Sequence, residues 1–88
     1  MEDFTQPQLL GRYIVIDPKI CHGKPTFRGT RIMVADVLEQ VGAGLAWETI
    51  IESWDDSIPR EAIAEAVQLG REAFLKHAPE FTLELMPA

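Results

Sequence analysis

The chain has little cysteine, no long apolar run and no obvious targeting segment. A single cysteine, Cys21, in 88 residues excludes an internal disulfide framework and fits a reducing compartment. No apolar run approaches the roughly 20 residues that a membrane-spanning helix requires. The amino terminus lacks the basic region and the apolar stretch of a secretory signal peptide. We therefore expect a cytoplasmic protein without a membrane partner.

Residue sets for metal binding and catalysis are equally scarce. Zinc needs about four ligands, and besides Cys21 and His22 the chain offers only one further histidine, His77. The run Gly23-Lys24-Pro25-Thr26 lacks the upstream glycine and the following helix of a phosphate-binding loop. No nucleophile, base and orienting residue form a recognisable set. The sequence therefore predicts no metal and no other cofactor, and a protein that is not an enzyme.

One stretch, residues 16–32, is far more constrained than the rest. It contains two of the six prolines and two of the six glycines. The prolines fix φ and favour extended neighbours, while Gly23 and Gly29 permit positive φ. The stretch cannot be helical, so we expect a looped or hairpin-like ribbon over residues 12–32. Its first strand is the aromatic and β-branched run Tyr13–Ile16, and Thr30–Ile32 could pair back as a second strand.

From residue 34 onward the apolar residues follow a helical period. Apolar residues at i, i+3, i+4 and i+7 predict helices at about 34–43 and 46–54, with Gly42-Ala43-Gly44 ending the first. A third helix, 59–76, is expected to begin at Pro59. The pair Asp55-Asp56 lies in a turn, where helix capping accounts for it. We expect a flexible lead-in at 1–11, one small domain at 12–77, and a tail at 78–88 that docks on a partner.

Short motifs within the ribbon resemble those of one protein family. Ile-Asp-Pro, then Gly-Lys-Pro, then Arg-Gly-Thr-Arg-Ile is similar to the hallmark of the family called domain of unknown function number 433, over roughly residues 13–74. One departure is His22, where the family usually has a small residue, often glycine. The resemblance implies a mainly α fold with a three-helix, homeodomain-like (helix-turn-helix) core. It also implies an antitoxin-like role beside a PIN-like nuclease toxin.

Charge is distributed unevenly along the chain. Residues 12–31 carry five Lys or Arg residues and one Asp, a net charge of +4, whereas residues 33–88 carry eleven acids and three Lys or Arg, a net charge of −8. A basic ribbon on an acidic body can steer an anionic partner to one face. The alternative is that the ribbon's cations pair with acids of the same chain or of a second copy in a dimer, Arg31 with Asp36 first of all.

The candidate binding residues follow from that asymmetry. They are the ribbon residues Lys24, Arg28, Thr30 and Arg31, together with Arg60 at the start of the third helix. The solvent face of that helix is roughly balanced in sign, which is more typical of a solvated or protein-binding surface than of a DNA-reading helix.

Two functions remain open at this point. The first is an antitoxin-like interaction module that binds and neutralises a PIN-like nuclease, with possible autoregulatory DNA binding. The alternative is a helix-turn-helix transcriptional regulator that binds DNA without a toxin partner. A strand at Tyr13–Ile16 with few partners in so short a chain also predicts a homodimer, in which the ribbon or the tail crosses to the second copy.

Overall fold

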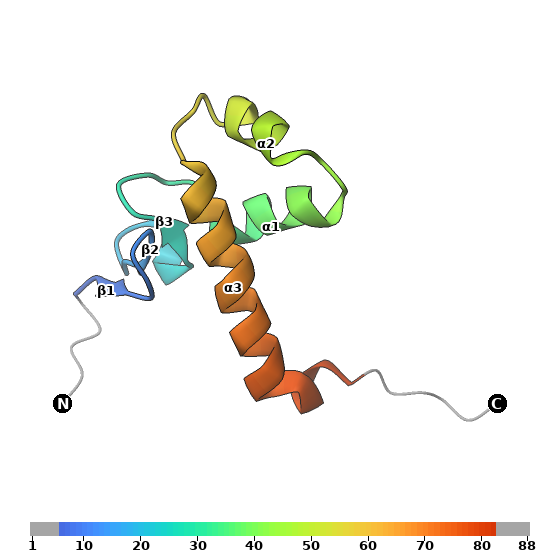
Figure 1. Cartoon of the computed structure of the whole chain (residues 1–88). Coiled ribbons are helices and arrows are strands. Elements are labelled where there is room, and N and C mark those ends of the chain that lie inside the picture. Colours follow the sequence, from blue (N-terminus) through green and yellow to red (C-terminus); the bar gives the residue numbers. More distant parts are fainter. Residues whose placement is uncertain (1–5, 83–88) are drawn as a thin grey trace.

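A computed structural model describes residues 6–82 of the chain. Most of the expected tail, residues 83–88, therefore lies outside the described residues, as does the first part of the lead-in. The order of elements is β1 (Gln8–Leu9), β2 (Ile14–Ile16), β3 (Thr26–Phe27), α1 (Val34–Gly42), α2 (Trp47–Ser53) and α3 (Arg60–His77). Short 3-10 turns, η1 (Cys21–Gly23) and η2 (Ala78–Phe81), follow β2 and α3. The expectation of a mainly helical fold preceded by a short N-terminal ribbon is confirmed (Figure 1).

The three strands form one small antiparallel sheet in the order β1-β2-β3. Gln8 pairs with Ile16, and Ile14 pairs with Phe27. Part of the segment expected to be a flexible lead-in is thus hydrogen-bonded in the sheet. Since β2 is the central strand, it has no free edge, and the premise for pairing Tyr13–Ile16 with a second copy was wrong.

The second strand of the ribbon lies earlier than the sequence suggested. It is Thr26–Phe27, whereas residues 30–32 form the end of a turn. The reason is local, because Gly29 has a φ of +83° and the N–H of Thr30 donates to the carbonyl of Phe27 at 2.9 Å. This is the geometry of a type II turn. The chain reverses at residues 28–29, so the residues after the turn return beside β3, where Met33 forms an isolated antiparallel bridge with Thr26, and not beside β2.

All helix ends lie within one residue of the expected bounds. Helices α1 and α2 end in the same type of C-terminal motif. Beyond α1, the N–H of Leu45 donates to Gln40 and that of Gly44 to Val41, with Gly44 at a φ of +87°. This is a Schellman motif, in which glycine takes the left-handed position. It confirms that glycine ends the first helix.

Helix α2 ends in the same way, but with an aspartate in the glycine's place. The N–H of Asp56 donates to Ile51 and that of Asp55 to Glu52, and Asp55 has a φ of +55°. The helix that follows has Pro59 as its N-cap and no side-chain cap. Asp55 and Asp56 therefore terminate α2 and do not cap the next helix.

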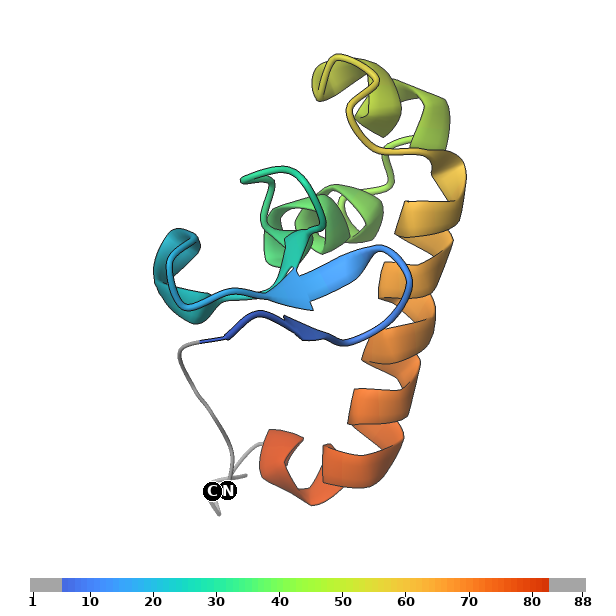
Figure 2. The same cartoon turned by 90° about the vertical axis from the view of Figure 1, so that its left-hand side faces the viewer.

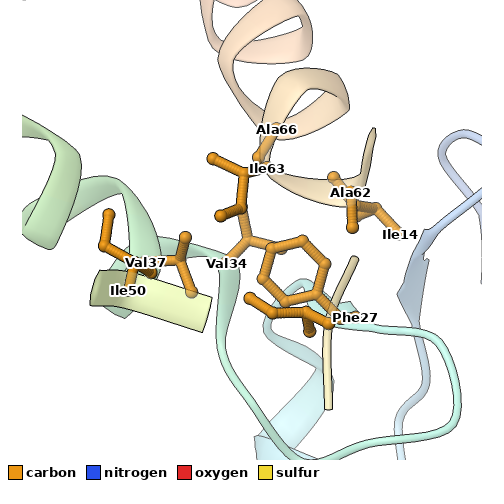
Figure 3. Packing of buried hydrophobic residues seen from close by; sticks show 9 residues of the cluster. Ile14, Phe27, Val34, Val37, Ile50, Ala62, Ile63 and Ala66 are labelled. Carbon is orange, nitrogen blue, oxygen red and sulfur yellow. The ribbon is translucent and has the colours of Figure 1, made fainter. Parts of the chain in front are cut away.

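The core lies where the sheet and the three helices meet (Figure 3). Ile14 and Phe27 come from the sheet, and Ile63 comes from α3; each is at most 1% exposed. The remaining buried members are Val34, Val37, Ile50, Ile58, Ala62 and Ala66. Burial of this kind stabilises a domain by roughly 25 cal/mol for each Å² of apolar surface removed from water.

The C-terminal half of α3 extends beyond that core. The last buried residue of the helix is Ala66, and every residue from Gly70 to Thr82 is exposed. Figures 1 and 2 show these turns, in orange and red, running clear of α1 and α2. The sheet and the other helices thus cover only the first half of α3.

Candidate functional site

The ribbon, residues 12–32, is held in shape by local hydrogen bonds. Asp17 Oδ1 accepts the backbone N–H of Lys19 at 2.9 Å, and the Asp17 carbonyl accepts that of Ile20. The first of these is an Asx turn, in which an aspartate side chain bonds the backbone two residues on. The only carboxylate of the ribbon is therefore engaged with its own backbone.

The turn η1 is left-handed. Cys21, His22 and Gly23 have φ values of 50°, 58° and 80°, a region that favours glycine and costs other residues roughly 1–2 kcal/mol each. His22 thus stands at a position where a glycine would fit without strain. The thiol of Cys21 lies 3.6 Å from the carbonyl oxygen of Arg31, so this turn touches the loop that follows β3.

That loop, residues 28–31, is closed tightly. The N–H of Phe27 donates to the carbonyl of Ile32 at 3.0 Å. The Thr30 hydroxyl donates to the Phe27 carbonyl at 2.8 Å and accepts the N–H of Ile32 at 3.0 Å. Thr30, expected to contact a partner, is therefore occupied in shaping the loop. Arg28 and Arg31 are at its two ends.

Three cations of the ribbon are exposed and, in the part of the chain that the structure describes, have no acidic partner. Lys24, Arg28 and Arg31 are all exposed, and within residues 6–82 none of them lies within 4.0 Å of a carboxylate oxygen. The expected ion pair of Arg31 with Asp36 is therefore absent. Asp36 lies in the first turn of α1, where the positive end of the helix dipole stabilises an acid without a paired cation.

Arg60 belongs to a different contact. Its Nη1 lies 2.6 Å from Glu48 Oε1, and its guanidinium carbon lies 4.9 Å from the centroid of the Trp47 ring. A hydrogen bond from the Glu48 backbone N–H, reinforced by the Arg60 charge, holds the pKa of the Glu48 carboxyl below its ordinary value. Arg60 therefore joins α3 to α2, and the structure does not bring it together with the ribbon cations.

A residue that sequence reasoning missed ties the ribbon to α3. The two carboxylate oxygens of Glu65 accept the backbone N–H groups of Arg12 at 2.8 Å and Tyr13 at 2.7 Å. Gly11 permits this approach, because a Cβ built there would lie 2.6 Å from Glu65 Oε1. No sequence pattern predicts this contact, since Glu65 has the spacing of an ordinary surface residue on a helix.

Two further findings concern sites of other kinds. In the part of the chain that the structure describes, no three His, Cys, Asp or Glu side chains gather closely enough to hold a metal ion. No helix among those residues combines the length and the apolar character needed to cross a membrane.

The protein is small and mainly helical, and its ribbon presents exposed cations. Two strands of the three-stranded sheet, β2 and β3, belong to this ribbon. The model of the family described as "Protein of unknown function (DUF433)" matches residues 14–69, more than half of the chain, and the chain belongs to that family. The resemblance drawn from the ribbon motifs is thereby confirmed. No curated protein and no solved structure matches the chain.

Proposed function

We propose that the protein is an antitoxin-like interaction module that binds and neutralises a PIN-like nuclease, with the ribbon as its contact surface. The observation that carries the proposal is the set of three exposed cations, Lys24, Arg28 and Arg31, without a carboxylate partner in the described residues. The type of partner follows from the family resemblance. A nuclease of this kind holds its metal with a cluster of acids, and such a cluster attracts cations.

The geometry of the ribbon suits such a contact. Arg28 and Arg31 lie in a loop closed by the hydrogen bonds of Phe27 and Thr30, so the backbone loses little freedom on binding. An arginine can bind a carboxylate through two parallel N–H donors. The ribbon also carries a net charge of +4 in a chain whose net charge is −6, which directs an acidic partner to this face.

The test uses the full chain and a PIN-like nuclease, taken from the adjacent reading frame if one is encoded there. The wild-type chain is expected to co-purify with the nuclease and to suppress its cleavage of RNA. The double variant Arg28→Ala/Arg31→Ala should weaken suppression by about tenfold or more, because truncating one partner of a buried charge pair at an interface costs roughly 2–5 kcal/mol.

Arg71→Ala is the matched control, because Arg71 is an exposed arginine outside the ribbon. It should leave suppression unchanged. Equal suppression by the wild-type chain and by the ribbon variant would overturn the proposal, as would the lack of any complex between the two wild-type proteins.

DNA binding by a homeodomain-like, helix-turn-helix regulator is the second candidate. The same exposed cations favour it, since phosphate is also an anion and such contacts position a protein on DNA. Helix α3 supports it less, because Arg60 is paired with Glu48 and Glu65 holds the ribbon. A salt titration with duplex DNA decides the matter. Loss of one phosphate contact should reduce the slope of log K against log salt by about one.

A further inference from the structure

The C-terminal half of α3 forms one wall of an open hollow of about 290 Å³. The facing residue, Leu10, comes from the connection between β1 and β2 and is 42% exposed. The helix contributes the residues Leu69, Glu72, Ala73, Lys76 and His77. The hollow thus has an apolar floor and charged groups on one helix.

The charges of the hollow are of both signs. Glu72 and Lys76 are one helical turn apart, a spacing at which they could pair with each other. They do not, since the ion pairs among residues 6–82 are Arg60 with Glu48 and His77 with Glu80. Among the described residues, Glu72 and Lys76 thus have no ion-pair partner, and they lie side by side on the same flank of α3.

This arrangement is self-complementary. In a two-fold contact each copy uses the same surface, so residue i of one copy meets residue j of the other, and the reverse. In two antiparallel helices the same flanks face each other. If the two-fold axis between the copies passes beside residue 74, position 72 of one copy faces position 76 of the other. The two pairings then bring together opposite charges.

We infer that a second copy of this chain occupies the hollow, with the two α3 helices antiparallel. Glu72 of each copy pairs with Lys76 of the other, and the apolar floor of Leu10, Leu69 and Ala73 is covered. Ala73 allows the close approach because its side chain is small. This contact uses neither the ribbon nor the nuclease, so it stands independently of the proposed function. It also replaces the expected crossing of ribbon or tail with a contact between helices.

Sedimentation equilibrium of the full chain tests the inference. The wild type is expected at about twice the monomer mass of 9.9 kDa. Glu72→Lys and Lys76→Glu, each made alone, place like charges opposite each other twice and should raise the dissociation constant by at least about tenfold. The combined variant Glu72→Lys/Lys76→Glu restores both pairings and should return the constant to near its wild-type value.

Arg71→Glu is the control, because Arg71 lies on the other side of α3 from the hollow. It should leave the mass unchanged, and circular dichroism should show all four variants folded. A wild-type chain that remains at 9.9 kDa up to about 200 µM would overturn the inference. So would a combined variant as dissociated as either single one, or a dimer that none of these changes affects. If the hollow variants weakened only nuclease binding, the occupant would be the nuclease and the second copy would be ruled out.

Discussion

The carboxylate of Glu65 accepts the backbone N–H of Tyr13 at 2.7 Å, across 52 positions of the sequence. Its other oxygen accepts the N–H of Arg12. One side chain of α3 thus satisfies two consecutive backbone donors immediately before β2, and Gly11 leaves the space for it. The contact joins the ribbon to α3 in addition to the core packing of Ile14 and Phe27.

Removal of the Glu65 carboxylate should therefore loosen the ribbon. Glu65→Ala is expected to lower the free energy of unfolding by about 1–3 kcal/mol, because two charge-assisted hydrogen bonds are lost. Gln68→Ala is the control, since Gln68 is an exposed residue one turn further along α3. Denaturant titration measures both variants. An equal change in the two would show that the Glu65 contact contributes no stability.

The two ribbon threonines should respond in opposite ways to loss of the hydroxyl. Thr26 is fully buried, and its Oγ1 has no hydrogen-bond partner in the described structure, whereas the Thr30 hydroxyl makes two hydrogen bonds. Thr26→Val should be neutral or stabilising by up to about 1 kcal/mol, and Thr30→Val should destabilise by about 1–2 kcal/mol. Thermal melts of the pair provide the comparison. Destabilisation by Thr26→Val as large as that by Thr30→Val would contradict it.

Gly29 is required by its backbone conformation and not by lack of space. Its φ is +83°, and a Cβ built there would meet nothing within 4 Å. Gly29→Val should lower the free energy of unfolding by about 1–3 kcal/mol, and Gly29→Asn by less, because asparagine tolerates this region. Gly42 also has open space but lies in α1 without a positive φ, so Gly42→Ala should be neutral or stabilising. Chemical denaturation of the three variants tests the order.

Asp55 offers a site for stabilisation. It ends α2 with a φ of +55°, where glycine is the favoured residue. Asp55→Gly should raise the free energy of unfolding by about 0.5–1 kcal/mol, the strain relieved being larger than the added freedom of the unfolded chain. Ser57→Gly is the control, because Ser57 has no positive φ, and it should be neutral or destabilising. A lower melting temperature for Asp55→Gly would mean that the carboxylate itself contributes at this turn.

The contact between Glu48 and Arg60 should make the free energy of unfolding depend on pH in the acidic range. The pKa of Glu48 is lower in the folded chain than its ordinary value of 4.5. Its contribution to stability is therefore fully present above about pH 4.5 and is lost as the pH falls through the lower, folded-state pKa. The difference in unfolding free energy between wild type and Glu48→Gln should shrink over that acidic range. Glu52→Gln, on the same helix, controls for the loss of one carboxylate, and a difference that is constant with pH would contradict the assignment.

The helices and the looped character of the ribbon follow from local rules that the sequence displays. The spacing of apolar residues placed all three helices to within one residue of their ends. The left-handed Gly44 ended the first helix as glycine does in many proteins. Residues 16–32 could not form a helix, because each proline fixes its own φ and each glycine permits a positive φ.

Other features depend on packing between distant segments. The strand at Thr26–Phe27, the pairing of Arg60 with Glu48, and the Glu65 contact with Tyr13 join residues 11 to 52 positions apart. The pairing of Arg31 with Asp36 does not form, although the two residues are close in sequence and both lie in the described part of the chain.

By itself the sequence determined the helical periods, the turns between the helices and the uneven distribution of charge. These depend on φ restrictions and side-chain spacing within a few residues. Only the tertiary structure decided which cations remain unpaired and which half of α3 lies outside the core. Those outcomes depend on how elements pack, and a hydrogen bond or ion pair across the fold forms only when both backbones bring its atoms within about 3–4 Å.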